Sequence, residues 1–303
     1  MCMIHDAMRQ LEDGHKTIVV VAPRILLAEQ LSSEFLEVIR EKYHHIQVMH
    51  VHSGETKHFS TTKVDMIQKW MNFCWGNKII FTTYHSLHRL VESDVVVDTI
   101  YFDEAHNAIQ KNFIESVDNF NALRSYFFTA TPKHSRTPFK VGMNNTDIFG
   151  NVICNVPAPK LVEQGYILPP KVEVYKTRLL RKDEIFADVE SEQMLNSIDR
   201  LDVDKVLICA KSTKQIVNLT SQSDFCYELG LRGYHWMYIT AKTGAIIDGK
   251  KVNREQFFET LNQWGKDDIK FVVLHHSILS EGINVSGLEA VLFMRNMDYI
   301  SIS

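Results

Sequence analysis

Two adjacent carboxylates, Asp103 and Glu104, are the residues of this sequence with the clearest chemical potential. They open the tetrapeptide Asp-Glu-Ala-His at 103–106, directly after the apolar run Thr-Ile-Tyr-Phe at 99–102. A buried strand that ends in two acidic side chains suits nucleotide hydrolysis, because one carboxylate can hold Mg²⁺ through its waters while its neighbour orients the attacking water. We expect Asp103 in the first role and Glu104 in the second. Taken alone, the tetrapeptide also fits an acidic helix N-terminus stabilised by the helix dipole.

The elements that must position this pair are short β-branched runs separated by helical stretches. We expect strands at 17–22, 47–52, 78–83, 99–102 and 125–129, and again at 205–210, 236–240, 270–275 and 290–294. Between residues 24 and 43, apolar side chains at positions 27, 31, 35 and 38 recur at helical spacing, which predicts an amphipathic helix. Alternation of this kind predicts a parallel sheet with helices on both faces, and the pattern occurs twice.

A proline-rich segment marks the expected domain boundary. Four of the seven prolines lie between positions 157 and 170, around a short helix at 160–164 that Gly165 would stop. We therefore expect a first domain at 1–155, a linker at 156–170 and a second domain at 171–303. A chain of 303 residues with 45% apolar content is large enough for two cores.

Several further segments follow the order of the motifs in superfamily 2 helicases and translocases of the DEAD/DEAH type, which this chain resembles. Segments 20–24 (Val-Val-Ala-Pro-Arg) and 82–87 (Thr-Thr-Tyr-His-Ser-Leu) resemble motifs Ia and Ib, and 128–132 (Phe-Thr-Ala-Thr-Pro) resembles motif III. Segments 206–212 and 279–284 resemble motifs IV and V, with Asn284 where the family commonly has Asp. The resemblance implies an α/β fold of two RecA-like parallel-sheet domains in tandem, which hydrolyse ATP to move along nucleic acid.

The resemblance also assigns roles to single residues. Asp103 would hold Mg²⁺ through water, Glu104 would activate the attacking water, and His106 would sense the γ-phosphate and couple hydrolysis to the strand-holding surface through Thr129 and Thr131. Contacts to the phosphodiester track, mostly without base reading, would come from Pro23, Arg24, Thr83, Tyr84, Ser212, Ser280 and Gly282. The implied cofactors are ATP and Mg²⁺.

The prediction of DNA or RNA as the bound nucleic acid rests on segment 161–170. It resembles the interdomain crossing of restriction-enzyme motor subunits and of phage or viral DNA helicases, which favours DNA over RNA. Whether a nuclease or methyltransferase subunit accompanies the chain stays open.

Two parts of the family pattern are missing from the sequence. No glycine-rich loop ends in Gly-Lys-Ser/Thr, and segment 14–17 (Gly-His-Lys-Thr) runs from a helix into a strand, the reverse of a phosphate loop, so Gly14 is interpreted as a helix cap. An amphipathic helix is expected almost from Met1, where the family has the helix that follows the phosphate loop. Motif VI would come after the strand at 290–294. We therefore expect a chain truncated at both ends and inactive as a fragment.

Composition and residue spacing narrow the classes of function that remain possible. A net charge of −4 is unlike that of a dedicated nucleic-acid-binding module, although a motor that releases its track in every cycle can use amides, hydroxyls and a few cations. No apolar run approaches the roughly 20 residues of a membrane span, and five scattered cysteines suit a reducing cytoplasm.

The adjacent histidine pairs at 44–45 and 275–276 have no Cys or carboxylate nearby at ligand spacing, so we expect no metal site among the histidines.

Two alternative functions stay open. The first is a non-motor module derived from a helicase, which would bind nucleic acid or a protein without hydrolysing ATP; failure of a verified full-length product to bind nucleotide would favour it. The second is an ATPase of another class, such as a transporter or a ring ATPase. Segments 129–131 and 280–282, on two different predicted sheets, argue against the second alternative.

Overall fold

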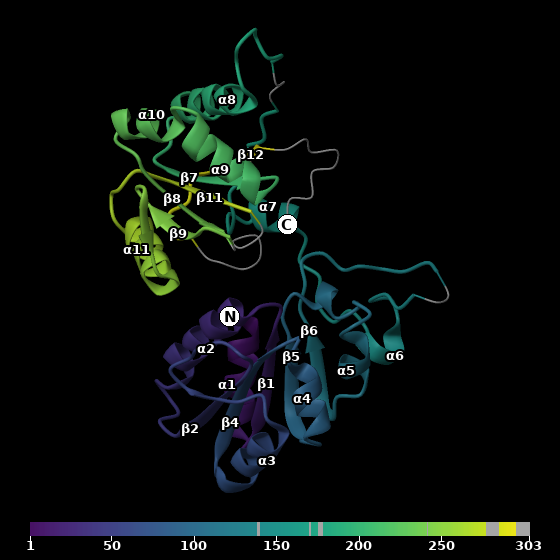
Figure 1. The fold of residues 1–303 in the computed structure, drawn as a ribbon. Coiled ribbons are helices and arrows are strands. Elements are labelled where there is room, and N and C mark those ends of the chain that lie inside the picture. Colours follow the sequence, from purple (N-terminus) through teal and green to yellow (C-terminus); the bar gives the residue numbers. More distant parts are fainter. Residues whose placement is uncertain (138–139, 170, 175–177, 241, 277–284, 295–303) are drawn as a thin grey trace. The chain divides into compact units, whose positions relative to one another are not determined.

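The computed structural model describes residues 1–137, 140–169, 171–174, 178–240, 242–276 and 285–294 (Figure 1). Contacts within the chain divide it into two compact units, Met1–Ile167 and Leu168–Ile302. The division falls inside segment 156–170, whose assignment as a linker stays a prediction. Each unit contains a predominantly parallel six-stranded sheet with helices, so the predicted fold class is confirmed.

The first unit is built on a fully parallel sheet in the order β3-β2-β4-β1-β5-β6. Its strands are β1 (Thr17–Ala22), β2 (Ile46–Val51), β3 (Phe59–Ser60), β4 (Asn77–Thr83), β5 (Val97–Phe102) and β6 (Ala122–Phe127). At its centre, Val19 of β1 lies opposite Ile80 of β4 and Ile100 of β5. These three side chains are fully buried, as expected for parallel strands that are covered on both faces.

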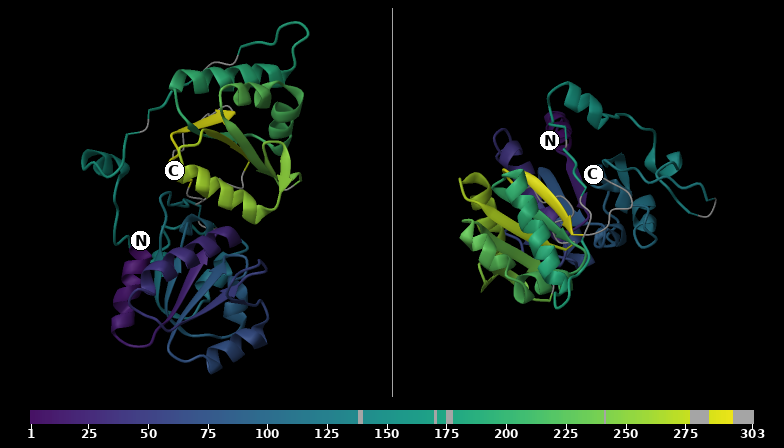
Figure 2. Two further views of the ribbon diagram at one scale, coloured as in Figure 1. Left: turned by 90° about the vertical axis from the view of Figure 1, so that its left-hand side faces the viewer. Right: turned by 90° about the horizontal axis from the view of Figure 1, so that it is seen from above.

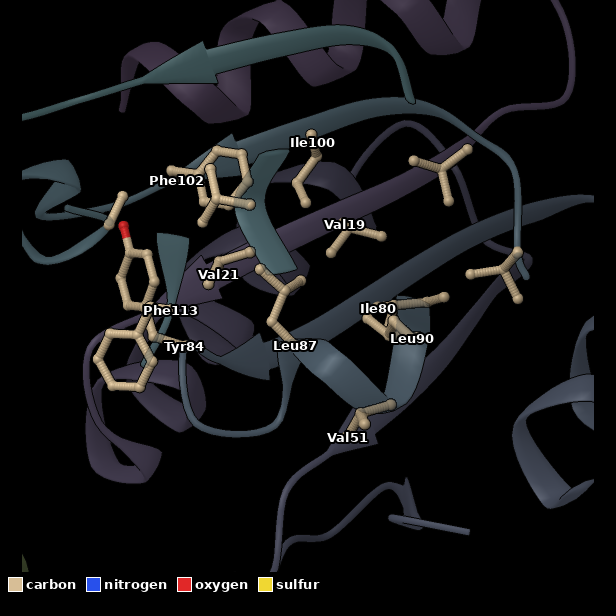
Figure 3. Packing of buried hydrophobic residues seen from close by; sticks show 14 of the residues in the cluster. Val19, Val21, Val51, Ile80, Tyr84, Leu87, Leu90, Ile100, Phe102 and Phe113 are labelled. Atoms are coloured by element: carbon tan, nitrogen blue, oxygen red, sulfur yellow. The ribbon is translucent and has the colours of Figure 1, made fainter. Parts of the chain in front are cut away.

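Helices cover both faces of this sheet. They are α1 (Cys2–Glu12), α2 (Ile25–Ile39), α3 (Val64–Phe73), α4 (Leu87–Glu92), the 3₁₀ turn η1 (Ala105–Asn107), α5 (Ile114–Asp118) and α6 (Thr146–Phe149). A further short helix, α7 (Ala158–Glu163), follows them in the chain and has no buried residue. One core joins α1 and α2 to Ile18 and Val20, and the other joins α3, α4 and α5 to Val19 and Val21 (Figure 3). Successive β1 side chains therefore face opposite cores, because side chains alternate along a strand.

The predicted helix boundaries are largely confirmed. Helix α1 begins at Cys2 and α2 spans 25–39 of the predicted 24–43. Gly14 follows α1 with a φ of +117°, and Gly165 follows α7 with a φ of +75°, so both glycines occupy backbone conformations that other residues rarely adopt.

The second unit contains a mixed sheet in the order β10-β9-β8-β11-β7-β12. Strands β7 (Lys205–Ala210), β8 (His235–Thr240), β11 (Phe271–His275) and β12 (Ala290–Met294) run parallel, as predicted. An antiparallel hairpin of β9 (Gly244–Ile247) and β10 (Lys250–Val252) extends the edge. This hairpin was not predicted, although its Asp248-Gly249 turn, with φ of +45° and +76°, is a typical hairpin signal.

Four further helices complete the second unit: α8 (Phe186–Leu201), α9 (Thr213–Gln222), α10 (Phe225–Leu231) and α11 (Arg254–Lys266). Helices α8, α9 and α10 pack together with Ile208 and Leu274 on one face of the sheet, whereas α11 packs with Met237 and Val273 on the other (Figure 2). Among the residues that the structure describes, no helix is both long and apolar enough to cross a membrane.

Candidate functional site

The carboxyl edge of the first sheet brings the predicted acidic pair to the strand ends. Because β1, β4, β5 and β6 are parallel, the segments that follow them meet at one edge. Backbone hydrogen bonds continue past the strands: Asp103 N donates to Val21 O (2.9 Å), and Ala105 N donates to Phe128 O (2.8 Å). The acidic pair is therefore fixed between β1 and the segment that follows β6.

His106 contacts three of the predicted site residues. Its Nδ1 lies 3.1 Å from Thr129 Oγ1, 3.3 Å from Thr131 Oγ1 and 3.2 Å from Glu104 Oε2. Thr129 Oγ1 also accepts a hydrogen bond from Thr131 N (3.1 Å). The imidazole of His106 is 14% exposed, so these contacts are largely shielded from water. One imidazole nitrogen thus connects the second carboxylate to both hydroxyls of segment 129–131.

Glu104 has an unusual backbone conformation. Its φ is +45° and its ψ is +51°, in the left-handed region that favours glycine. This residue turns the chain from β5 into η1, and Asn107 Nδ2 donates to its carbonyl oxygen (3.1 Å). A non-glycine residue held in this region costs about 1–3 kcal/mol, which the surrounding contacts must offset.

Asp103 lies in an environment that opposes its negative charge. Burial and the neighbouring Glu104 carboxylate raise the pKa of Asp103 to about 6, from an ordinary value of 3.8. Two adjacent carboxylates, one of them with a raised pKa, offer hard oxygen ligands and negative charge at one point. This donor set fits Mg²⁺.

The side chain of Tyr84 lies in the core beside the acidic pair. It is 1% exposed, stacks on Phe102 and Phe113 (Figure 3), and its hydroxyl donates to Asp103 O (2.8 Å). Burial and the charges of Asp103 and Glu104 raise its pKa well above the ordinary value. Its side chain therefore supports the acidic pair from the core, and a contact of Tyr84 with nucleic acid stays a prediction.

The remaining predicted contact residues differ in accessibility. Thr83 is 3% exposed, Pro23 is half-buried and Arg24 is exposed at the start of α2. Ser212, in the second unit, caps α9 by accepting a hydrogen bond from Gln215 N. Ser280, Gly282 and Asn284 lie outside the described residues.

The structure also adds residues that the sequence analysis missed. Asn107 is buried, and besides contacting Glu104 it accepts a hydrogen bond from Gln110 Nε2 (2.8 Å). This amide pair stabilises the turn that carries Glu104 and His106. The signal in the sequence that could have indicated Asn107 is its position as a polar residue directly after the tetrapeptide 103–106.

Comparison with known proteins agrees with the order of the motifs. Residues 1–134 match the family model described as type III restriction enzyme, res subunit. The fold is also similar to that of LlaGI, a type ISP restriction-modification enzyme whose nuclease-deletion mutant was solved with a DNA substrate mimic. The TM-score is 0.62 and the identity 18% over 95% of this chain and 21% of LlaGI. The resemblance to superfamily 2 helicases is confirmed. Both units have the RecA-like fold of that superfamily.

A second solved structure has the same superfamily 2 fold. The helicase Lhr of Mycobacterium smegmatis, bound to single-stranded DNA and AMP-PNP, matches with a TM-score of 0.50 and 14% identity over 92% of this chain and 36% of Lhr. The chain thus spans about a fifth of LlaGI and about a third of Lhr. No curated protein matches the sequence.

Proposed function

We propose that this chain is the motor part of a DEAH-type ATPase that hydrolyses ATP to translocate along, or unwind, nucleic acid. The observation that carries the proposal is the contact of His106 with Glu104, Thr129 and Thr131. A residue that responds to the state of the nucleotide must touch both the catalytic carboxylate and the segment that transmits the change. His106 does both through one nitrogen.

In the proposed hydrolysis step, Asp103 holds Mg²⁺ through its waters and Glu104 orients the water that attacks the γ-phosphate. Bound Mg²⁺ would supply positive charge against the developing charge on the phosphate oxygens. The raised pKa of Asp103 supports this role, because a carboxylate destabilised by its neighbours gains most from a nearby cation. The left-handed backbone at Glu104 supports a functional role for that residue, since strained residues persist where geometry is required.

We further propose that the nucleic-acid track contacts both domains, 1–155 and 171–303, joined by the linker 156–170. In the first domain, the accessible contacts are Pro23 and Arg24 at the start of α2, together with the backbone around Thr83. In the second, Ser212, Ser280 and Gly282 keep their proposed roles. DNA is favoured over RNA, supported by segment 161–170 and by the DNA ligands of LlaGI and Lhr.

The decisive experiment is Glu104→Gln in a longer polypeptide that contains this chain together with a phosphate loop and motif VI. We expect ATP turnover to fall by at least about 100-fold while nucleotide binding is retained, because the amide cannot act as a base. Glu115→Gln is the matched control, since Glu115 is exposed on α5 of the same domain.

Two results would contradict the proposal. Turnover of the Glu104→Gln variant within a few-fold of the parent protein would remove Glu104 from catalysis. Stop codons directly on both sides of this reading frame, together with failure to bind nucleotide, would favour the non-motor binding module.

A further inference from the structure

Three ligand atoms from two elements of the first unit converge beside the carboxyl end of β2. His50 Nδ1 lies 3.0 Å from His52 Nε2, and Glu29 Oε1 lies 3.2 Å from the first nitrogen and 3.3 Å from the second. His50 is fully buried and His52 is 2% exposed, whereas the Glu29 side chain is 29% exposed. The three atoms form a nearly equilateral triangle, and Glu29 Oε1 is itself buried although its side chain is partly exposed.

The fold explains why these residues meet. His50 and His52 are two positions apart at the end of β2, so both imidazoles project to the same face of the sheet. Glu29 is one turn into α2, which packs on that face. Ser32, on the next turn of α2, places its hydroxyl 3.0 Å from His50 Nε2, and His58 stacks on the His50 ring.

The triangle has the dimensions of a metal site. Ligands bound at about 2.0–2.1 Å to a tetrahedral zinc ion lie about 3.3 Å from one another, close to the three observed separations. Among the described residues, Glu29 Oε1 is a buried oxygen without a well-aligned hydrogen-bond donor.

We propose that Glu29, His50 and His52 bind a divalent transition-metal ion of the zinc type. Two imidazole nitrogens and one carboxylate oxygen suit Zn²⁺ or Co²⁺, whereas Mg²⁺ prefers oxygen ligands alone. The Ser32 hydroxyl accepts from His50 Nε2–H and so holds the ring in the tautomer that leaves Nδ1 free to bind metal. A water molecule would complete the coordination of the ion.

One contact must change when the ion binds. Gly54 N donates to His52 Nδ1 (3.2 Å), so the proton of a neutral His52 ring lies on Nε2. Metal at Nε2 displaces this proton to Nδ1, and the Gly54 amide then bonds to water. Gly54 is half-exposed in a loop, which makes this exchange inexpensive.

The ion would join α2 to β2. Helix α2 begins directly after Arg24, and a side chain at Gly54 would lie 2.4 Å from Ile25 Cγ2, so the loop after β2 packs tightly against the start of that helix. The site is separate from Asp103 and Glu104. It neither requires ATP hydrolysis nor depends on the proposed function.

Metal binding to the full chain tests the proposal. After removal of metal with a chelator, the chain is titrated with Co²⁺, followed by its visible d–d absorption, and with Zn²⁺ in competition with a chromophoric chelator, in excess Mg²⁺. We expect one ion per chain and a tetrahedral Co²⁺ spectrum. Glu29→Gln and His52→Gln should each weaken binding by at least about 100-fold, because each removes one of three ligands.

The matched control is the double variant His44→Gln/His45→Gln, which removes two exposed histidines of the same unit and should bind as the parent does. Zn²⁺ should also raise the Tm of the parent and of this control, but not that of Glu29→Gln. Glu29→Gln decides the outcome if His52→Gln fails to fold, because Glu29 is partly exposed. Equal Zn²⁺ affinity of Glu29→Gln and the parent chain, or no binding by the parent, would overturn the proposal.

Discussion

The hydroxyl of Tyr84 donates a hydrogen bond to the carbonyl oxygen of Asp103, with 2.8 Å between the two oxygens. Tyr84 directly follows β4 and Asp103 follows β5, and β1 lies between these strands in the sheet. The bond therefore spans the carboxyl end of β1 and fixes the backbone at the start of the acidic pair. It makes the position of Asp103 depend on the packing of an aromatic core.

We expect Tyr84→Phe to destabilise the first unit. The ring contacts remain, but the Asp103 carbonyl loses a buried donor, which costs about 1–3 kcal/mol. Urea denaturation of the full chain measures the change. Tyr43→Phe is the control, because the Tyr43 hydroxyl makes only a 3.4 Å bond to a carbonyl of the same unit and its loss should cost less. An equal effect of both substitutions would contradict the role of the Tyr84 hydroxyl.

The raised pKa of Asp103 predicts a pH dependence of stability without Mg²⁺. The folded state binds this proton more tightly, with a pKa of about 6 against 3.8. As pH rises from about 4 to about 6, the unfolded chain loses the proton first, so stability falls by up to about 3 kcal/mol and the cost then stays constant. Asp103→Asn removes this cost and should be more stable than the parent at pH 7, but about equally stable at pH 4.

Urea midpoints between pH 4 and pH 7 measure this difference. Asp65→Asn provides the control, because the Asp65 side chain is 64% exposed on α3. Parallel pH curves for the parent and Asp103→Asn would contradict the proposed environment of Asp103.

The left-handed backbone of Glu104 predicts an inverted ranking of substitutions. Glu104→Gly should be more stable than Glu104→Ala by about 1 kcal/mol, because only glycine adopts a positive φ without strain. At Glu37, an exposed position inside α2, the order should be the ordinary one, with Ala more stable than Gly by about 1 kcal/mol. Thermal denaturation of the four variants tests both rankings. A higher Tm for Glu104→Ala than for Glu104→Gly would contradict the strained backbone at this turn.

The contact between His106 and Thr129 predicts a loss of coupling. In the longer polypeptide, Thr129→Val keeps the side-chain shape but removes the hydroxyl 3.1 Å from the imidazole. We expect the stimulation of ATP turnover by nucleic acid to fall by about 10-fold or more, as for loss of a hydrogen bond to a charged or polar partner. Thr129→Ser should retain stimulation. Full stimulation of Thr129→Val would show that this contact does not transmit the signal.

Local patterns in the sequence were sufficient to predict most helices and parallel strands of the fold. The apolar runs at 17–22 and 205–210 became strands with those bounds, because a strand buried on both faces requires consecutive apolar residues. The Asp248-Gly249 hairpin was not predicted, although the sequence carries its signal: the turn needs positive φ at both residues, which an Asp-Gly pair favours.

Contacts between distant segments were decided by the tertiary structure alone. Sequence order and motif resemblance indicated that His106 and Thr129 act together, but their 3.1 Å separation depends on the pairing of β5 with β6. The burial of the Tyr84 side chain was also not predicted, because a motif identifies a segment without stating which of its side chains face the core. The convergence of Glu29 with His50 and His52 joins residues 21 and 23 positions apart, which neither spacing nor composition reveals.

The sequence by itself determined the strands, the helices, the repeated α/β pattern and the acidic pair at the end of β5, because these features follow from side-chain period and local backbone preference. Only the tertiary structure decided which side chains are buried, how burial raises the pKa of Asp103, and where histidines meet a carboxylate. The physical reason is that burial and electrostatic coupling depend on distances between elements, and those distances are set by the packing of the whole unit.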